Sequence, residues 1–354
     1  MSQEETIPIR PGEAFDFQKV ENYLRQHLQD IGEGTLVVKQ FPSGASNLTY
    51  LLHIGAWEGV LRRPPFGPLP PKAHDMERES HLLERIHPVF PLAPRPFLFC
   101  NDLDIIGAPF YVMERRKGVV INDAFPPEVQ PTEDLCRRIS YTAVETLAQI
   151  HSIDWQAAGL GDFGYPQGFI GRQVKRWIEA YFRAQTDDLP QVEPLTRWLA
   201  GHIPTDQSPT LIHNDFKLNN MLLSADDLAR PSAVLDWEMA TIGDPLMDLA
   251  ITLGYWVNSQ DPEEIRTILP TVTVLPGFIS RERFMEEYAR LTGRDLSAMH
   301  FYLTFAYFKL VVIIQQIYAR WKHGQTGDAR FAAFGSRVRM LADYAARFAE
   351  AGKV

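Results

Sequence analysis

An acid, a lysine and two amides lie between two apolar runs in residues 211–223, which read LIHNDFKLNNMLL. Asp215 and Asn220 are the candidate reactive groups of this stretch, and a second acid, Asp236, follows the next apolar run. Carboxylate and amide oxygens are ligands of hard cations, and Mg²⁺ held together with substrate phosphates is the usual case. Phosphoryl transfer needs this set, because one Asp orients the acceptor hydroxyl while an Asn and another Asp hold Mg²⁺.

Other chemistries explain these residues less well. A zinc site needs nitrogen or thiolate ligands, and His213 is the one nitrogen ligand in this stretch. A glycosidase-like pair of acids leaves the amide and the histidine without a role. A capped turn with incidental acids is the alternative without chemistry, and the apolar flanks and the following VLDWE disfavour it. The spacing His213-x-Asp215-x4-Asn220 is the catalytic-loop pattern of protein-kinase-like enzymes.

Short strands have to position these groups. TLIHND and NMLLS predict two strand-like arms with the loop 213–219 between them, and a buried strand over 233–235 delivers Asp236 at its end. We therefore expect Asp215, Asn220 and Asp236 to converge at one end of a sheet.

The rest of the chain divides by pattern into a sheet-rich part and a helical part. Short β-branched or alternating segments at 35–41, 47–55 and 57–64 are separated by Gly and Ser and predict an antiparallel meander. An amphipathic helix is predicted over 74–87, and a long helix with a Thr/Glu capping start over 131–153.

These elements predict an α+β fold with two lobes. Residues 1–115 would form a small N-terminal lobe around an antiparallel sheet, which binds the nucleotide. Residues 116–354 would form a larger, mainly helical lobe that holds the catalytic residues and the acceptor, because helical patterns dominate after residue 160.

If the chain transfers phosphate, its N-terminal lobe has to hold a nucleotide. The segment FPSGASNLTY places small residues between two strands, so that backbone N–H groups can approach an anion. The candidates are Ser43, Gly44, Ser46 and Asn47. No Gly-Lys-Ser/Thr follows, so the segment is not a P-loop, and an ordinary hairpin is the alternative.

A cation for the phosphates is expected at the end of the strand that reads VLRR. Arg62 or Arg63 can meet the α- and β-phosphates, and Glu79 on the following helix can hold that cation in place. A surface ion pair is the alternative interpretation.

The segment FYVMERRKG predicts a strand that runs out into the hinge between the lobes. Backbone groups near Glu114 and Arg116 would meet the adenine edge, with Met113 packed beside the base. As sequence alone, the same residues also fit a buried strand followed by a loop.

Composition excludes several classes of partner. A net charge of −9 argues against nucleic acid and anionic membranes, since both attract a basic surface. The longest apolar stretch, 301–321, is interrupted by Lys309, Gln315 and Gln316, which favours a core helix over a membrane span. Two cysteines are too few for a disulfide framework, and the first residues do not read as a signal peptide, so a cytoplasmic location is expected.

Four segments, taken in order, resemble the aminoglycoside phosphotransferase and choline kinase superfamily, which has the bilobal protein-kinase-like fold. They are SGASNLTY, the helix with Glu79, HNDFKLNNMLL and LDWEMATIGDPLMDLA, and they span about residues 36 to 250. The resemblance implies ATP and Mg²⁺ as cofactors, Asp215 as the catalytic base, and Asn220 and Asp236 as ligands of Mg²⁺.

The same resemblance implies two structural acids in the segment GDPLMDLA. Asp248 would be the buried anchor of the catalytic loop, and Asp244 would be a helix cap rather than a ligand. Two positions depart from the pattern. Arg62 stands where protein kinases have Lys, and Arg offers a planar fork instead of a point charge. Asn214 stands where many relatives have Gly.

The C-terminal segments resemble one branch of the superfamily, the kinase domain fused to some acyl-CoA dehydrogenases. GRQVKRWIEAYFRAQ, FKLVVIIQQIYAR and LPGFISRERFMEEYARLTGRDLSAMHFY carry this likeness. The branch implies that the phosphate acceptor is a hydroxy acid linked to coenzyme A.

The predicted function is an ATP- and Mg²⁺-dependent kinase of a small-molecule hydroxyl acceptor. An antibiotic phosphotransferase of the aminoglycoside type and a catalytically weak, nucleotide-binding regulatory module are the alternatives. Acceptor contacts are expected from the helical lobe. The alternative interpretation is core packing, because Trp and Tyr at helical spacing are more often core residues. The candidates are Gln173, Trp177, Tyr181, Gln315 and Arg320. The sequence does not indicate an oligomeric state.

Overall fold

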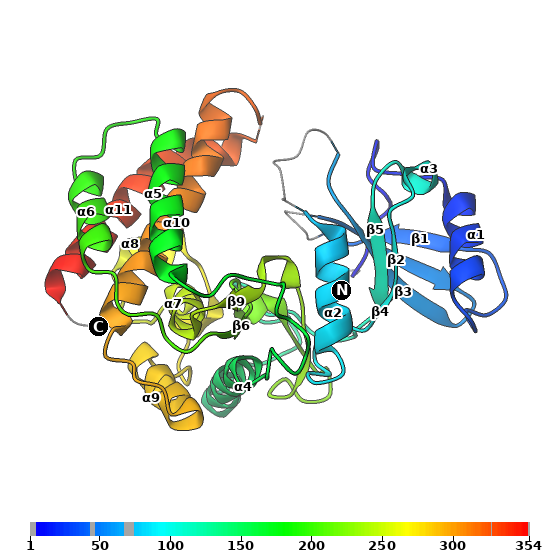
Figure 1. Ribbon diagram of the computed structural model, residues 1–354, viewed down its shortest axis with the longest axis horizontal. Helices are drawn as coiled ribbons and strands as arrows, with labels where there is room; N and C mark the ends of the chain where they lie inside the picture. The colour runs from blue at the N-terminus through cyan, green and yellow to red at the C-terminus, as the bar shows by residue number, and fades with distance from the viewer. Residues whose placement is uncertain (1–4, 43–46, 67–73, 327, 353–354) are drawn as a thin grey trace. The chain divides into compact units, whose positions relative to one another are not determined.

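The computed structural model describes residues 5–42, 47–66, 74–326 and 328–352. The chain divides into two compact units, one built on a sheet and one mainly helical (Figure 1). The N-terminal unit comprises Met1–Gly118 and Ser232–Met239, and the C-terminal unit comprises Val119–Pro231 and Ala240–Val354. The expected division at residue 115 did not anticipate that residues 232–239 group with the N-terminal unit.

The N-terminal unit is built on a five-stranded antiparallel sheet with the strand order β1-β2-β3-β5-β4. The strands are β1 (Val37–Gln40), β2 (Leu48–Ile54), β3 (Trp57–Arg63), β4 (Pro96–Cys100) and β5 (Phe110–Glu114). The predicted α+β class and the antiparallel sheet of this unit are confirmed.

Side chains alternate between the two faces of this sheet, as the period of a strand requires. On one face, Tyr50, Leu61 and Val112 form a core with Val20 and Leu24 of helix α1 (Phe17–His27). Helix α2 (Met76–Ile86) packs against β4 and β5 on the opposite face. Figure 1 shows α1 and α2 on the two sides of the sheet.

The alternation decides which strand residues point toward α2. Arg62 follows Leu61 and pairs in register with Tyr111 of β5, so both belong to the face opposite the α1 core. Arg63 points the other way, and its guanidinium donates to the carbonyl of Ile106 over 3.1 Å. Of the two arginines that the sequence left open, Arg62 is therefore the one that faces the helix carrying Glu79.

Residues 232–239 join the N-terminal unit through backbone and aromatic contacts. They contain most of β8 (Pro231–Val234) and all of the 3₁₀ turn η2 (Trp237–Met239). The N–H of Val234 donates to the carbonyl of Leu92 over 2.8 Å, and the buried Trp237 ring packs edge-on against Phe90. Asp236 is thereby carried to the α2 side of this unit.

The C-terminal unit is mainly helical. Its helices are α4 (Glu133–His151), α5 (Phe169–Ala184), α6 (Val192–Gly201), α7 (Pro245–Tyr255), α8 (Glu263–Ile268), α9 (Arg281–Thr292), α10 (Met299–Lys322) and α11 (Phe334–Ala351). Short strands β6 (Thr210–Ile212) and β9 (Thr241–Gly243) pair with each other, and β7 (Met221–Leu223) follows the 3₁₀ turn η1 (Leu218–Asn220). The capping start of α4 is present, because the Thr132 hydroxyl accepts from the N–H of Leu135. The remaining short elements are α3 (Leu103–Ile106), η3 (Val272–Val274) and η4 (Ala329–Ala333).

Helix α10 is the apolar stretch that the sequence predicts as a core helix. By length and composition it is the one helix of the described residues that qualifies as a candidate membrane span. It packs against α11, α7 and α5, and 72% of its most apolar 18-residue stretch is buried inside the structure. Burial of this kind is the property of a core helix.

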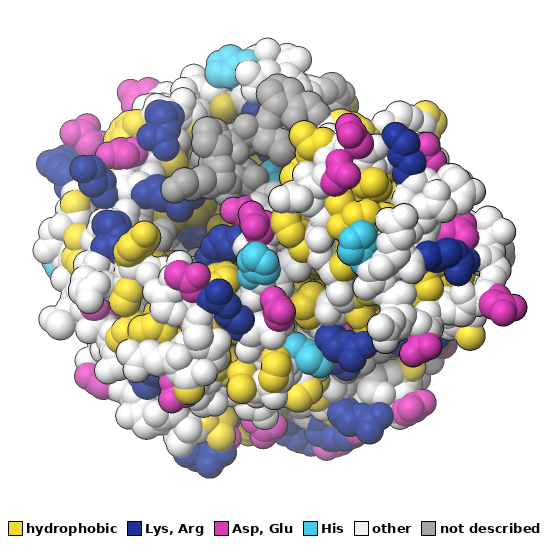
Figure 2. All heavy atoms as spheres, turned by 45° about the vertical axis from the view of Figure 1, so that its right-hand side comes forward, with side chains coloured by type: hydrophobic (Ala, Val, Ile, Leu, Met, Phe, Trp, Pro, Cys, Tyr) yellow, Lys and Arg dark blue, Asp and Glu magenta, His cyan; other side chains and the backbone are white. Residues whose placement is uncertain are grey.

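Charged side chains of both signs are interspersed over the face drawn in Figure 2, with hydrophobic side chains between them. This surface agrees with the chain's mixed charge content.

The turn at Gly277 fixes the segment that follows η3 against the first turn of α4. Gly277 has φ +94°, and a Cβ atom at this position would collide with the backbone of Glu133. Gly293 has φ +68° but open space around the same atom. Gly277→Ala should therefore cost several kcal/mol of unfolding free energy, whereas Gly293→Ala should cost about 1 kcal/mol for its left-handed backbone alone.

Urea denaturation of the two variants and wild type measures this difference. Equal losses in both variants would contradict the packing argument, because the two glycines share a left-handed backbone and differ in the space around Cβ.

Candidate active site

The loop after β6 is held by one buried carboxylate. Asp248 of α7 is fully buried, and its two oxygens accept from the backbone N–H groups of His213 and Asn214, each over 2.7 Å. Its Oδ2 also lies 3.1 Å from Nε2 of the buried His151. Burial opposes ionisation, but the bonds from His151 and His213 outweigh it and hold the pKa of Asp248 below its ordinary value. Asp248 thus anchors this loop, as the family resemblance implied.

Asp244 begins the same helix as its N-cap. Its Oδ1 accepts from the N–H of Leu246, and its Oδ2 accepts from the Tyr302 hydroxyl and from the N–H of Gln207. The prediction that Asp244 is a cap is therefore correct.

Asp215 and Asn220 lie together in the anchored loop. The Asn220 amide nitrogen donates to the carbonyl of Asp215 over 2.8 Å and to its carboxylate over 3.0 Å. Lys217 forms an ion pair with the same carboxylate over 2.9 Å. The amide nitrogen of Asn220 makes these bonds, so the amide oxygen of Asn220 is the atom available to a cation. The carboxylate of Asp215 remains partly accessible.

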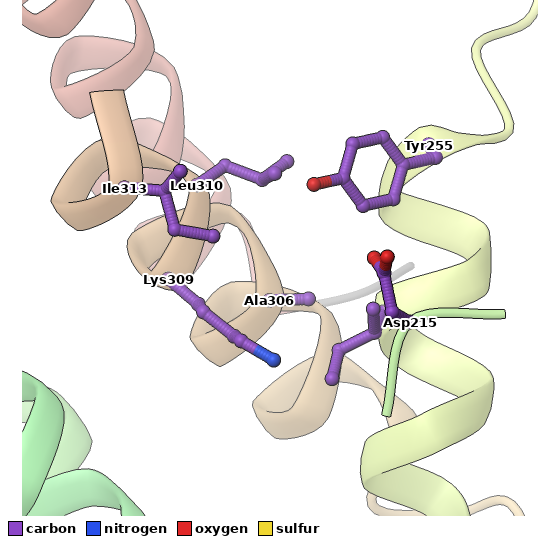
Figure 3. A pocket seen from close by; sticks show the side chains of 7 residues that line it. Asp215, Tyr255, Ala306, Lys309, Leu310 and Ile313 are labelled. Carbon is purple, nitrogen blue, oxygen red and sulfur yellow. The ribbon is translucent and has the colours of Figure 1, made fainter. Parts of the chain in front are cut away.

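Two cavities adjoin this loop. The smaller one has a volume of about 30 Å³ and is lined by Asp215, by Tyr255 of α7 and by Lys309 of α10, together with four apolar side chains. Figure 3 shows these three polar side chains around it, with Ala306, Leu310 and Ile313 beside them. Burial, assisted by the nearby Asp215, raises the pKa of Tyr255, so its hydroxyl stays protonated.

The larger cavity has a volume of about 430 Å³, within the range of small-molecule sites. Lys217 and Tyr255 line it, and the Lys217 ammonium lies 5.0 Å from the centre of the Tyr255 ring. Its walls are mixed, with Trp256, Leu269 and Ile121 among the apolar residues. Both cavities have Tyr255 in their walls, and the larger one is also lined by Lys217, the ion-pair partner of Asp215.

In the N-terminal unit, Arg62 is the centre of a buried ion-pair cluster. Its Nη1 donates to Glu79 over 2.7 Å and its Nη2 to Asp236 over 3.0 Å. Burial raises the pKa of Glu79, whereas the acids around Arg62 outweigh burial and raise the pKa of the guanidinium. The predicted Arg62–Glu79 pair is therefore present, and it is buried rather than a surface pair.

Asp236 itself has a left-handed backbone, with φ +67°. Its carboxylate accepts from Arg62, which also lies 3.8 Å from the Glu238 carboxylate. Glu238 in turn accepts from the Asn47 amide over 2.6 Å. The Asn47 oxygen lies 2.9 Å from Nδ1 of His74. Asn47 is thus held by two neighbours in the N-terminal unit. Ser43, Gly44 and Ser46 lie outside the described residues.

The three hinge candidates are at the end of β5. Met113 is buried and pairs with Val60 of β3. Glu114 accepts from Arg116 Nε over 2.8 Å, and its backbone N–H already donates to the carbonyl of Arg95. The adenine contact that the sequence predicted near Glu114 would therefore have to use other backbone groups of this segment.

The acceptor candidates from the sequence are scattered. Trp177 contacts Lys309, with 5.3 Å between the ammonium and the ring centre. Tyr181 is buried, and Gln315 donates to the carbonyl of Ala184, so both serve helix packing. Gln173 is half-buried and Arg320 is exposed.

Sequence reasoning missed three residues around Asp215. Lys217 pairs with its carboxylate, and Tyr255 and Lys309 line the same cavity. Lys217 lies inside the catalytic-loop pattern, so its position two residues after the acid was the available signal. Lys309 had been noted as an interruption of the apolar run, but its partner across the fold was not visible. Tyr255 carried no signal, since an aromatic residue at a helix end is ordinary.

The two residues predicted as Mg²⁺ ligands, one in each unit, carry donor atoms of the kind that this ion prefers. Asn220 offers an amide oxygen and Asp236 a partly exposed carboxylate, which are the oxygen ligands this ion prefers. Within the described residues, no group of three His, Cys, Asp or Glu side chains could hold a metal ion by itself. Mg²⁺ commonly uses one or two protein ligands and completes its shell with phosphates and water.

Comparisons with known proteins identify the family and the fold of this chain. A family model described as "Phosphotransferase enzyme family" matches residues 37–300. Acyl-CoA dehydrogenase family member 11 of Gallus gallus is 36% identical over 350 residues, which are 96% of this chain and 44% of that protein. The corresponding human protein is 36% identical over 344 residues, with 95% and 43% covered. The chain thus spans less than half the length of these curated relatives.

Solved structures show the same fold. A candidate aminoglycoside phosphotransferase from Ralstonia eutropha has a TM-score of 0.81 and 29% identity, with 96% of this chain and 100% of that chain covered. An aminoglycoside phosphotransferase in complex with AMP-PNP and hygromycin B has a TM-score of 0.60, 18% identity and coverages of 93% and 98%. Choline kinase from Cryptosporidium parvum has a TM-score of 0.64, 12% identity and coverages of 95% and 96%. The predicted kinase-like fold is confirmed.

Replacing the loop anchor should destabilise the protein. In Asp248→Asn, one of the two carboxylate oxygens becomes an amide nitrogen, so a buried N–H of the loop loses its acceptor. We expect a loss of about 3 kcal/mol in unfolding free energy at pH 7, measured by urea denaturation. Asp134→Asn is the control, because Asp134 pairs with Arg137 at the surface, and it should change stability by less than about 0.5 kcal/mol.

The pH dependence gives a second check of the same residue. Since the folded pKa of Asp248 is lowered, its contribution is present above the unfolded value of about 3.9 and is lost as the pH falls through the folded value. The deficit of Asp248→Asn should therefore narrow below about pH 4. A deficit that is independent of pH would contradict this assignment.

Proposed function

This chain belongs to the phosphotransferase enzyme family, and we propose that it is an ATP- and Mg²⁺-dependent kinase that transfers the γ-phosphoryl group to the hydroxyl group of a small molecule. The observation that carries the proposal is the anchored loop, in which Asp215 is oriented by Asn220 and Lys217. Asp215 lines the smaller cavity, and Lys217 of the same loop lines the larger one. A phosphotransferase of small molecules is also what the family match and the structural neighbours support.

In the proposed reaction, Asp215 is the catalytic base. The acceptor oxygen bonds to the γ-phosphorus, the bond from that phosphorus to the ADP oxygen breaks, and the hydroxyl proton passes to Asp215. A positioned carboxylate contributes by orienting the hydroxyl and by taking up its proton as the new bond forms. Lys217, which pairs with Asp215, keeps the carboxylate in one orientation and adds a positive charge beside the transferred group.

Asn220 and Asp236 are the proposed ligands of Mg²⁺. The bound ion would neutralise charge on the phosphates during transfer. Arg62 would bind the phosphates of ATP, because its guanidinium is held in place by Glu79 and is always charged. Ser43, Gly44, Ser46 and Asn47 would approach the phosphates from the segment before β2. Met113, Glu114 and Arg116 would border the adenine.

The finer identity of the acceptor is drawn from the relatives. The curated relatives are named acyl-CoA dehydrogenase family members, so we propose a hydroxy acid linked to coenzyme A as the acceptor. Lys217 in the wall of the larger cavity is compatible with an acceptor that carries negative charge or carbonyl oxygens. We propose the cytoplasm as its location, since both cysteines are free and buried.

Substitution of Asp215 separates an enzyme from a module that only binds nucleotide. Asp215→Ala should lower ADP release at least about a hundredfold, because the base is lost, while the binding of Mg·ATP remains. ADP release and thermal unfolding with and without Mg·ATP measure the two effects. If wild type binds Mg·ATP but Asp215→Ala releases ADP at the wild-type rate, Asp215 is not the base.

Asp236→Ala should remove the stabilisation by Mg·ATP. A ligand at ten times its Kd stabilises by about 1.4 kcal/mol, which shifts the unfolding midpoint by a few degrees. The shift should be present in wild type, lost in Asp236→Ala and kept in the surface control Asp134→Ala. An unchanged, Mg²⁺-dependent shift in Asp236→Ala would argue against its role as a ligand.

A further inference from the structure

A lysine is buried in the middle of the apolar helix α10. Lys309 is 6% exposed, and its ammonium has three N–H donors. Its contacts are a long hydrogen bond of 3.5 Å to the carbonyl of Asn214 and the ring of Trp177 at 5.3 Å. Among the described residues, no carboxylate lies within 4.0 Å of it. A buried ammonium without an ion-pair partner is costly, and an apolar side chain would pack here at lower cost.

The position of Lys309 suggests a function that explains why this unfavourable burial is kept. Its side chain lines the 30 Å³ cavity together with the Asp215 carboxylate and the Tyr255 hydroxyl, as Figure 3 shows. A space of this size holds about one water molecule, which needs two to four polar partners. The three side chains can supply them, so the ammonium and the carboxylate can be linked through one water or one hydroxyl group.

Lys309 also completes the support of the residue before Asp215. Asn214 has a left-handed backbone with φ +69°, its N–H donates to Asp248, and its carbonyl faces Lys309. The two peptide groups that flank Asn214 are therefore held on one side by an anion from α7 and on the other by a cation from α10. The second of these peptide groups leads directly into Asp215.

We propose that Lys309 is a positioning residue of the phosphoryl transfer: it holds the Asn214 carbonyl and faces the Asp215 carboxylate across the cavity, and so orients Asp215 toward the attacking hydroxyl. This inference rests on the proposed function. It concerns Asp215 alone and makes no use of the nucleotide-binding residues of the N-terminal unit.

The surroundings of Lys309 give this role a pH dependence. Burial lowers the pKa of Lys309 to about 8, against the attraction of Asp215 and Asp248, while Arg176 of α5 and Lys217 add to the lowering. Tyr255 also faces the cavity from α7, but its pKa is raised, so it stays neutral. Between about pH 7 and 9, Lys309 loses its charge and Asp215 loses the cation that faces it.

The test uses ATP hydrolysis, in which water replaces the acceptor and the products are ADP and inorganic phosphate. Lys309→Met removes the charge and keeps an unbranched chain of similar length. We expect kcat to fall about 10- to 100-fold, the scale of a misplaced catalytic group, while KM for ATP changes less than about twofold. The wild-type decline in kcat near pH 8 should be absent from the variant.

Lys322→Met is the matched control, because Lys322 lies on the same helix and pairs with Asp187 at the surface over 2.8 Å. It should keep the wild-type rate and pH profile. The Mg·ATP-dependent thermal shift of each variant reports whether the fold and the nucleotide site are intact. Wild-type kcat and an unchanged pH profile in Lys309→Met would overturn the inference.

A second measurement does not depend on activity. NMR of ¹³Cε-labelled lysine, with Lys309→Met to assign the signal, gives the pKa of Lys309 in wild type and in Asp215→Asn. Titration near pH 8 that moves lower in Asp215→Asn supports the coupling of the two side chains. Titration near the ordinary value of about 10.4, or no response to Asp215→Asn, overturns it. If wild type shows no Mg·ATP-dependent shift, the proposed function fails, and this measurement still decides the placement of Lys309.

Discussion

The buried carboxylate of Asp248 is the interaction on which the C-terminal half of the site depends. Its two oxygens hold the backbone of the residues before Asp215 and also contact His151. A charge at zero exposure persists because each oxygen has hydrogen-bond donors, and such charge-assisted bonds are about twice as strong as neutral ones. The helix that carries Asp248 begins with the Asp244 cap and ends at Tyr255, a wall of both cavities. Helix α7 therefore connects the core of the unit to its reactive loop.

Two of the buried cations, Arg62 and Lys309, are accommodated in different ways. Arg62 has a planar fork whose two arms meet Glu79 and Asp236, so its burial is compensated by acids of its own unit. Lys309 has no such partner and depends on a carbonyl, an aromatic ring and a distant carboxylate. The first arrangement keeps a guanidinium permanently charged, as a phosphate ligand requires. The second lowers the pKa of the ammonium to about 8, which agrees with the positioning role proposed for Lys309.

The sequence predicted those features that depend on local pattern. Alternation indicated the antiparallel sheet, the spacing of Asp215 and Asn220 indicated that both lie in one loop, and the family resemblance indicated Asp248 as the anchor of that loop. The choice between Arg62 and Arg63 depends on which face of β3 meets α2, and that is a long-range property of the register. Lys309 was visible as a charge in an apolar run, but helical periodicity carries no information on what lies across the fold. The chain belongs to the phosphotransferase enzyme family. A description of its candidate site needs both the local sequence pattern and the long-range packing.

The membership of residues 232–239 in the N-terminal unit has a consequence for synthesis of the chain on the ribosome. About 110 residues separate the two parts of this unit. At 5 to 20 residues per second, Arg62 and Glu79 are made roughly 8 to 35 seconds before Asp236 and Trp237 can reach them. During this interval the α2 side lacks two acids that pair with Arg62, Asp236 and Glu238, and the indole that packs against Phe90. The N-terminal unit is therefore completed only after about half of the C-terminal unit has been made.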